Sequence, residues 1–212
     1  MRVVEAKFLT SAAGPTDGRG WPEPGPPEVA FVGRSNVGKS TLLNALLGQR
    51  KSLVRTSADP GRTRLINFFD AVVVDDDKSS RALRFVDLPG FGYAKAPRSE
   101  RERFRAIVQS YLERRASLRA AVILVDMRRG VEIDETELKT FLESPTRRVI
   151  IVGTKADKLA KHERKPAAEK IARALSAPVI AVSADTGEGI DQLWRRLLLA
   201  VVDPPASAPT PG

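Results

Sequence analysis

A phosphate-binding loop is the feature of this chain whose residue types most directly indicate chemistry. It follows an apolar run and reads Gly33-Arg34-Ser35-Asn36-Val37-Gly38-Lys39-Ser40. Glycines at both ends let consecutive backbone N–H groups face a phosphate, Lys39 can reach the β- and γ-phosphates, and Ser40 Oγ can ligate Mg²⁺. A helix that opens at Lys39 adds the positive end of its dipole. We therefore expect residues 33–40 and the adjoining Thr41 to bind a nucleotide's phosphates, rather than to form a mere Gly-rich turn.

A second element of the same site is predicted at the end of the strand-like run 83–86, where the sequence reads Asp87-Leu88-Pro89-Gly90. Asp87 can hold Mg²⁺ through a water molecule, and the N–H group of Gly90 can meet the γ-phosphate. A strand-terminal Asp is common in α/β proteins. Its place downstream of a phosphate loop is what favours a role in metal binding here.

Guanine recognition is indicated by Thr154-Lys155-Ala156-Asp157, which follows the strand-like run 149–152. The carboxylate of Asp157 offers two acceptors to the paired N1–H and 2-amino donors of guanine, which adenine lacks. Lys155 would lie along the base and ribose, and a backbone N–H from Val182-Ser183-Ala184 could meet guanine O6. The alternative role for Asp157 is helix capping beside surface lysines.

The polar, basic segment between these motifs contains Pro60-Gly61-Arg62-Thr63. A threonine here could give its hydroxyl to Mg²⁺ and its N–H to the γ-phosphate, ordering the segment only around a triphosphate. Thr56 is the competing candidate. We favour Thr63 because it abuts the next strand-like run and follows a flexible Pro-Gly pair. The expected Mg²⁺ ligands are therefore Ser40, Thr63 and, through water, Asp87.

The elements that must position these residues alternate between short β-branched runs and helical patterns. Strands are predicted at residues 29–32, 65–69, 83–86, 121–125, 149–152 and 178–182. Helical periodicity predicts two helices with one apolar face each. The apolar face of the first helix carries Phe104, Ile107, Val108, Tyr111 and Leu112, and that of the second carries Ile190, Leu193, Trp194, Leu197 and Leu198. Their aromatic residues are expected in the core rather than against a ligand. The alternation predicts an α/β fold, a mostly parallel sheet with helices on both faces.

The chain divides into an N-terminal strand and Pro/Gly-rich loop at residues 1–27, a nucleotide-binding domain at 28–202, and a tail at 203–212 that we expect to be disordered. With 212 residues and 42% hydrophobic content, one buried core is the default. The absence of cysteine excludes disulfides and Cys-based zinc sites. The only histidine, His162, lies in a charged run and is expected at the surface. The charged start and the lack of a long apolar run predict a soluble, cytoplasmic protein without a membrane span.

The formal net charge of +9 points to a polyanionic partner, RNA or a ribonucleoprotein. Arginines surround the segment 87–99 and the helix predicted after it. Because these arginines alternate with glutamates, two interpretations remain: they form an RNA-binding surface, or they belong to a solvated face of salt bridges. The arginines concerned are Arg98, Arg101, Arg103, Arg105, Arg114 and Arg115.

Together these motifs closely resemble the EngB (YihA/YsxC) family of bacterial GTPases, within the TrmE-Era-EngA-EngB-septin-like class. The resemblance spans about residues 28–202, includes Asp126-Met127-Arg128-Arg129-Gly130, and is most specific at Asp87-Leu88-Pro89-Gly90-Phe91-Gly92-Tyr93-Ala94-Lys95. It implies a Ras-like P-loop fold and GTP hydrolysis with Mg²⁺. It also implies a role in large ribosomal subunit assembly, with the subunit or its rRNA as partner, and a link to cell division and septation. We expect the chain to be a monomer.

The sequence also departs from common GTPase patterns. GTPases generally carry Asn at the position of Thr154, which implies a weaker bond from that loop to the phosphate loop. Phe91 stands where many Ras-like enzymes place a water-orienting glutamine, so intrinsic hydrolysis is expected to be slow. In related potassium-dependent GTPases an Asn at the position of Asn36 helps to ligate K⁺, although here it could simply brace the loop. The resulting catalytic set is Lys39, Asn36, Thr63 and Gly90.

The function favoured by the sequence is a GTPase switch in which GTP orders residues 54–64 and 87–99 and hydrolysis releases them. One alternative is a GTP-gated ribosome- or RNA-binding module with negligible turnover. Another is a small-molecule phosphotransferase, against which a guanine-reading Asp157 argues.

Overall fold

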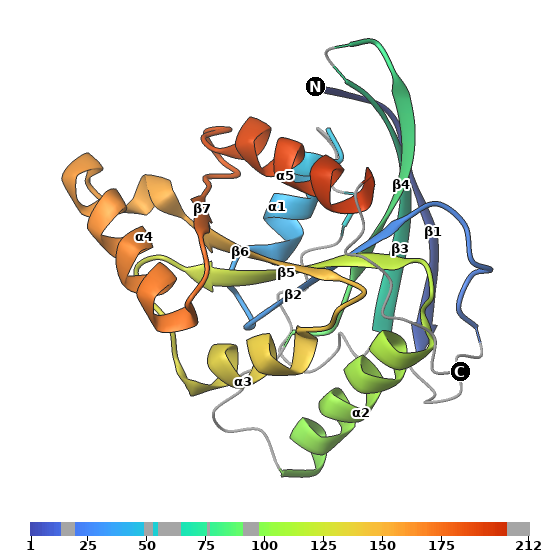
Figure 1. The fold of residues 1–212 in the computed structure, drawn as a ribbon, viewed down its shortest axis with the longest axis horizontal. Coiled ribbons are helices and arrows are strands. Elements are labelled where there is room, and N and C mark those ends of the chain that lie inside the picture. The colour runs from blue at the N-terminus through green and yellow to red at the C-terminus, as the bar shows by residue number, and fades with distance from the viewer. Residues whose placement is uncertain (14–19, 49–52, 55–64, 76, 91–97, 203–212) are drawn as a thin grey trace.

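Alternating strands and helices build a seven-stranded sheet whose strand order is β1-β3-β4-β2-β5-β6-β7 (Figure 1). The computed structural model describes residues 1–13, 20–48, 53–54, 65–75, 77–90 and 98–202. The strands are β1 (Arg2–Ala13), β2 (Glu28–Gly33), β3 (Leu65–Val74), β4 (Ser80–Asp87), β5 (Leu118–Asp126), β6 (Arg148–Thr154) and β7 (Val179–Ala181). Strands β4, β2, β5, β6 and β7 are parallel. The predicted α/β fold with a mostly parallel sheet is confirmed.

Helices cover both faces of the sheet because the central strands are apolar on both sides. Every residue of β2 is buried, as is usual for a parallel strand between two helical layers. Helices α1 (Lys39–Leu46) and α5 (Ile190–Val202) pack on one face. Helices α2 (Arg98–Arg114), α3 (Ile133–Leu142) and α4 (Lys161–Leu175) pack on the other. A short 3-10 helix, η1 (Ala156–Lys158), follows β6.

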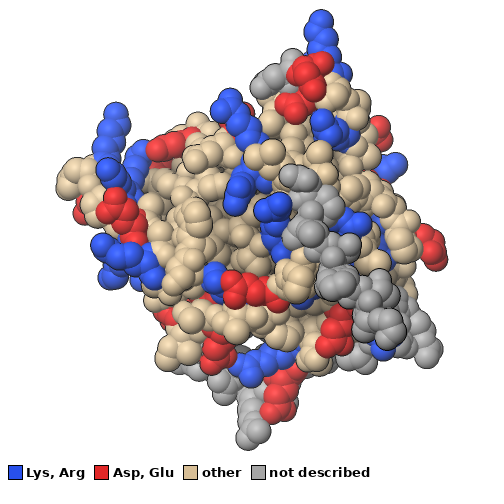
Figure 2. All heavy atoms as spheres, in the orientation of Figure 1, with Lys and Arg blue, Asp and Glu red and all other residues tan. Residues whose placement is uncertain are grey.

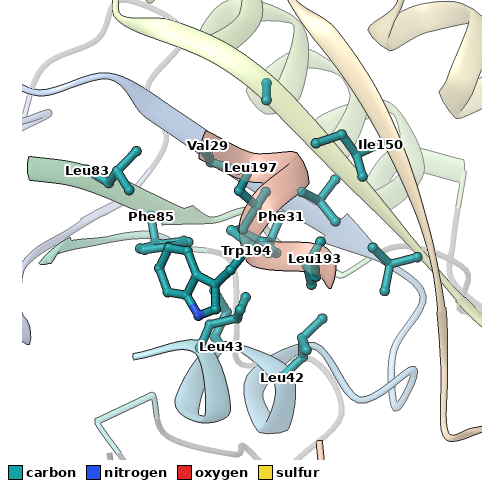
Figure 3. Packing of buried hydrophobic residues seen from close by; sticks show 14 of the residues in the cluster. Val29, Phe31, Leu42, Leu43, Leu83, Phe85, Ile150, Leu193, Trp194 and Leu197 are labelled. Atoms are coloured by element: carbon teal, nitrogen blue, oxygen red, sulfur yellow. The ribbon is translucent and has the colours of Figure 1, made fainter. Parts of the chain in front are cut away.

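The first of the two cores is built around Trp194 of α5, which is 4% exposed. Its ring packs edge-on against Phe85, with the centroids 5.5 Å apart, and Phe85 in turn contacts Phe31 (Figure 3). Tyr111 of α2 is completely buried in the second core. These positions confirm that the aromatic residues Tyr111 and Trp194 on the two periodic helices are core residues. His162 of α4 is exposed, as predicted.

The strands β1, β3 and β4 form an antiparallel extension at one edge of the parallel sheet. The short strand expected at the N-terminus is a 12-residue strand that pairs with β3 along most of its length. Residues 20–27 contain neither helix nor strand. Within the described part of the chain, no helix is long and apolar enough to cross a membrane.

A buried ionic cluster ties residues 20–27 to the end of the sheet remote from the phosphate loop. Glu28, fully buried at the start of β2, accepts hydrogen bonds from Arg115 Nη2 at 2.6 Å and from the Tyr111 hydroxyl at 2.5 Å. Arg115 also donates to the Pro22 carbonyl at 2.8 Å, and Arg84 donates to the Glu23 carbonyl at 2.9 Å. The two arginines thus hold the loop against the core.

This cluster corrects one interpretation of the arginines near α2. Arg115 is 7% exposed, and its guanidinium forms an ion pair with the carboxylate of Glu28. Arg115 is therefore not part of an RNA-binding surface. Arg105 is exposed and pairs with Glu137 of α3 at 2.6 Å, in agreement with the salt-bridge alternative. The described part of the chain does not include residues 55–64, 91–97 and 203–212 or the side chains of Arg98, Arg101 and Arg103.

Candidate nucleotide-binding site

The phosphate loop joins the carboxyl end of β2 to the start of α1, so the predicted strand–loop–helix arrangement is present. Two of its residues adopt the left-handed backbone region, Asn36 at φ 64° and Gly38 at φ 100°. A Cβ added to Gly33 would lie only 2.9 Å from Val37 Cγ1. Glycine is therefore required at Gly33 by close packing and favoured at Gly38 by backbone conformation. Ser40 and Thr41 lie in the first turn of α1.

Asp87 reaches the phosphate loop because β4 is the neighbour of β2 and ends beside it, with Asp87 paired to Phe31. The carboxylate is 3% exposed. Its Oδ1 pairs with the Lys39 ammonium, and its Oδ2 accepts a hydrogen bond from Asn67 Nδ2 at 3.2 Å. The cation of the phosphate loop and the proposed metal-binding carboxylate are therefore in direct contact.

Gly90 also lies against the phosphate loop. A Cβ added to it would stand 3.2 Å from Ser35 Oγ and 3.5 Å from the Ser35 backbone nitrogen. The absence of a side chain thus permits the close approach of this segment to the loop. Lys39, Asp87 and Gly90, which the sequence assigned to one site, are adjacent in the fold.

Two side chains join the phosphate loop to residues 154–157, which the sequence predicts to read guanine. Thr154 Oγ1 donates a hydrogen bond to the Val37 carbonyl at 2.6 Å. Lys155, in the left-handed region at φ 60°, donates from Nζ to the Asn36 carbonyl at 2.6 Å. The parallel strands β2 and β6 therefore deliver the two loops to the same edge of the sheet, where α/β proteins bind their ligands.

Asp157 lies within η1, whose N-cap is Lys155, while the N-cap of α4 is Ala160. Helix capping therefore does not account for this aspartate. Its carboxylate pairs with Lys158 Nζ at 2.9 Å. Hydrogen bonds from Lys158 and Ser183 lower its pKa. Asp157 is thus ionised at neutral pH and offers its oxygens as acceptors.

The segment 182–184 closes the same side of the site. The N–H of Val182 donates to the Gly153 carbonyl at 2.7 Å, and the N–H of Ser183 donates to the Glu188 carbonyl at 2.9 Å. The N–H groups of Val182 and Ser183 are therefore both hydrogen-bonded within the protein. The base contact predicted for residues 182–184 therefore stays a prediction for the N–H group of Ala184.

Asp126 is a site residue whose role was not worked out from the sequence, although it opens one of the motifs that resemble EngB. It ends β5 between the two nucleotide loops, and its carboxylate accepts from Lys155 Nζ at 3.0 Å and from Arg128 Nη2 at 2.7 Å. Burial raises the pKa of Asp126, but the hydrogen bonds from Arg128 and Lys155 outweigh it and lower the pKa to about 2. Asp126 therefore stays charged and anchors Lys155.

Asn67 is the other residue that sequence reasoning missed. It lies inside an ordinary strand-like run, and only the pairing of β3 with β4 brings it opposite Asp87. The one available signal was a polar residue inside the otherwise apolar run 65–69.

The oxygen donors near Lys39 suit Mg²⁺. Ser40 supplies a hydroxyl and Asp87 a carboxylate, and Mg²⁺ commonly takes one or two protein oxygens together with substrate phosphates. Across the described residues, there is no group of three or more His, Cys, Asp and Glu side chains that could hold a metal ion. A hydroxyl and a carboxylate are a donor set that fits a Mg²⁺ ion shared with nucleotide phosphates. Thr63 and its neighbours Pro60, Gly61 and Arg62 lie outside the described residues.

A family model described as "50S ribosome-binding GTPase" matches residues 28–155. The chain is also 43% identical to the probable GTP-binding protein EngB of Anaeromyxobacter sp. (strain K), over 98% of this chain and 96% of the relative. This chain belongs to the EngB family of GTP-binding proteins. The EngB protein of Pelobacter propionicus shows 44% identity over 93% of this chain and 94% of its own length.

Solved structures agree with the assignment to the EngB family. A crystal structure of a probable EngB protein superimposes with a TM-score of 0.62 and 27% identity, covering 83% of this chain and 99% of that one. An Era protein from Aquifex aeolicus bound to GDP and AlF4⁻ gives a TM-score of 0.66 and 26% identity, covering 82% of this chain and 56% of that one. The chain is therefore a GTP-binding protein of a GTPase family.

Proposed function

We propose that this chain is a Mg²⁺-dependent GTPase that switches its affinity for the large ribosomal subunit, or its rRNA precursor, with the bound nucleotide. The observation that carries the proposal is the junction of the two nucleotide loops by Thr154 and Lys155 beside the Lys39–Asp87 pair. A base and a triphosphate held at this junction would contact both loops at once. We extend the proposal, on the resemblance to EngB, to a monomer that acts in the cytoplasm and is needed for normal division and septation.

In this proposal each part of the site has its own binding role. Backbone N–H groups of the phosphate loop, other than that of Val37, which donates to the Arg34 carbonyl, would face the phosphates, and Lys39 would exchange the carboxylate of Asp87 for phosphate oxygens. Asp157 reads guanine N1–H and the 2-amino group, and Ala184 N–H meets O6. Bound Mg²⁺ would neutralise phosphate charge, held by Ser40, Thr63 and, through water, Asp87.

Hydrolysis in this proposal depends on positioning rather than on a glutamine. Gly90 brings its N–H to the γ-phosphate, while Phe91 offers no group that orients water. We therefore expect a slow intrinsic rate, and K⁺ held in part by Asn36, or the ribosomal partner, would supply the missing stabilisation. Asn36 is exposed in the loop and accessible to such a cation.

The metal roles can be separated by substitution. Ser40→Ala should impair binding of GDP·Mg²⁺ and GTP·Mg²⁺ alike, whereas Thr63→Ala should impair chiefly GTP·Mg²⁺, because only the segment of Thr63 must order around the γ-phosphate. Thr56→Ala is the matched control. If Thr63→Ala binds GTP·Mg²⁺ as the wild type does while Thr56→Ala binds it more weakly, then Thr56 and not Thr63 is the Mg²⁺ ligand.

The charge of the chain supports a ribosomal partner. Exposed basic residues are spread over α4 and α5, interspersed with acidic ones (Figure 2): Lys161, Lys165, Lys170, Arg173, Arg195 and Arg196. Contacts with RNA phosphates release counterions, so affinity for the subunit should fall steeply with salt. A merely adhesive basic surface would show the same salt slope with GDP and with GTP.

The deciding experiment is sedimentation with large ribosomal subunits at near-physiological salt under GDP, GTP and a non-hydrolysable GTP analogue. A switch requires different subunit affinities in its two states, and couplings of this kind are typically about 5- to 150-fold. Identical affinity with GDP and with the analogue would refute the switch. Single-turnover hydrolysis with and without subunits then separates the GTPase from a binding module with negligible turnover.

A further inference from the structure

A row of polar side chains crosses the antiparallel edge of the sheet and ends at the phosphate loop. Ser11 of β1 is paired with Asn67 of β3, and Asn67 is paired with Asp87 of β4. Residues directly opposite one another on neighbouring strands lie on the same face of a sheet. The row therefore connects the edge strand β1 to the carboxylate that contacts Lys39.

The side chains of the row are hydrogen-bonded in a fixed direction. The Ser11 hydroxyl donates to Asn67 Oδ1 at 2.6 Å, and Asn67 Nδ2 donates to Asp87 Oδ2 at 3.2 Å. Because the amide oxygen of Asn67 is engaged by Ser11, its NH₂ group faces the carboxylate. The reversed amide would set two acceptors, Oδ1 and the Asp87 carboxylate, against each other.

The two oxygens of Asp87 consequently have different roles. Oδ1 pairs with Lys39 on the side of the phosphate loop, whereas Oδ2 is held by Asn67 from the side of the sheet. A carboxylate that binds a metal through water must present one oxygen at a fixed angle, and a hydrogen bond to its other oxygen supplies that orientation. Asn67 occupies the place of such a partner.

We propose that Asn67 is a positioning residue for the metal-binding carboxylate of Asp87, and that Ser11 of β1 orients Asn67. The inference rests on the proposed function, in which Asp87 binds Mg²⁺ through water. It gives β1 a role in the affinity of the nucleotide site for metal. Ser11 and the whole of β1 lie outside residues 28–155, which the GTPase family model matches.

Ser11 suits an experimental test because it is exposed, so its hydroxyl can be removed without opening the core. Thr10, the neighbouring residue on β1, is paired with Phe68 and lies on the opposite face of the strand by the alternation of side chains. Thr10→Ala is therefore a matched control for any general loosening of β1.

The experiment measures GDP dissociation rate and affinity across a Mg²⁺ titration, and again in EDTA, for the full chain and its Asn67→Ala, Asn67→Asp, Ser11→Ala and Thr10→Ala variants. Loss of a hydrogen-bond partner of a metal ligand typically costs 10- to 100-fold in metal affinity. We expect the Mg²⁺ concentration for half-maximal retention of GDP to rise by about 10-fold or more in Asn67→Ala and by a few-fold in Ser11→Ala. Asn67→Asp, which faces Asp87 with a second carboxylate, should also require more Mg²⁺ than the wild type. GDP affinity in EDTA should stay at the wild-type value, and Thr10→Ala should match the wild type throughout.

The double variant Ser11→Ala/Asn67→Ala tests whether Ser11 acts on Asp87 through Asn67. If Ser11 acts through Asn67, the double variant should need no more Mg²⁺ than Asn67→Ala alone. An unchanged Mg²⁺ requirement in both single variants, or an equal loss of GDP affinity with and without Mg²⁺, would overturn the inference. Should Asn67→Ala fail to fold, Ser11→Ala decides alone. A wild-type protein whose GDP retention does not depend on Mg²⁺ would instead refute the metal part of the proposed function.

Discussion

The hydroxyl of Thr154 donates to the carbonyl oxygen of Val37 across 2.6 Å, and both residues are buried. This bond ties the loop after β6 to the phosphate loop. A threonine in place of the usual asparagine implied a weaker connection, yet the structure shows that the shorter side chain reaches the carbonyl directly. The Thr154 hydroxyl also lies 3.3 Å from the carbonyl of Val125 in β5, so it contacts both that strand and the phosphate loop.

Replacing Thr154 with valine should remove the donor while keeping the shape of the side chain. The buried Val37 carbonyl would lose its partner, at a cost of about 1–3 kcal/mol in unfolding free energy. GDP affinity should fall as well, because the phosphate loop loses the hydrogen bond that connects it to the loop after β6. Urea unfolding and fluorescent GDP titration measure the two effects. Thr154→Ser, which keeps the hydroxyl, is the control, and a Thr154→Val protein with wild-type stability and affinity would contradict the role of the bond.

Asp157→Asn should change the base that the site prefers. An amide NH₂ would face a guanine donor, weakening GTP by roughly 2–3 kcal/mol. Xanthosine nucleotides, which carry an accepting oxygen at C2, should bind better to this variant than to the wild type. Fluorescent-nucleotide titration provides the comparison. Lys158→Ala, which removes the partner of Asp157 and keeps its carboxylate, should retain the preference for guanine; unchanged GTP affinity in Asp157→Asn would exclude Asp157 as the base reader.

Turnover should be faster in KCl than in NaCl at equal ionic strength. With Phe91 unable to orient water, a K⁺ ion held in part by Asn36 can stabilise the charge that develops between the β- and γ-phosphates. The measurement is single-turnover GTP hydrolysis in each salt. Asn36→Ala should abolish the difference between the salts, and a wild-type rate that is indifferent to the cation would reject the prediction.

Asp126 should make the stability of the protein depend on acid pH. Its folded pKa of about 2 lies below the reference value of 3.8. A depressed pKa contributes stability above the unfolded pKa, and the contribution is lost as the pH falls through the folded pKa. The stability gap between the wild type and Asp126→Asn should therefore be constant from neutral pH to about 5 and shrink by about 2 kcal/mol toward pH 2. Urea unfolding at several pH values measures this gap, and a gap that does not vary with pH would show that the interactions of Asp126 do not depend on its charge.

Arg115→Ala should be strongly destabilising although the residue directly follows the charged helix α2. Removing it would leave the carboxylate of Glu28 buried without its main partner, at a cost of about 3–5 kcal/mol. Arg105→Ala, which breaks the exposed pair with Glu137, should cost about 1 kcal/mol or less. Thermal or urea unfolding compares the two variants. Equal, small losses would mean that Glu28 does not need Arg115.

The phosphate loop, the strands that precede the site residues and the two aromatic-bearing helices were predictable from sequence because each depends on neighbours a few residues away. The Gly and Lys spacing of residues 33–40 specifies a strand–loop–helix turn locally. The apolar period around Tyr111 and Trp194 reports which helix face is buried. These features are confirmed at the level of the fold, and the described residues assigned to one site do come together at the carboxyl edge of the sheet.

Tertiary structure alone decided the contacts between residues distant in the chain. Arg115 looks like its exposed neighbours in sequence, and only the start of β2 at Glu28 draws it into the interior, because a buried carboxylate requires a paired cation. The Thr154–Val37 bond spans 117 positions, and the row from Ser11 to Asp87 exists only in the register that joins β1, β3 and β4. Local sequence determines which residues can do chemistry, while strand order and register determine which partners they meet, since side chains act only at hydrogen-bond distance.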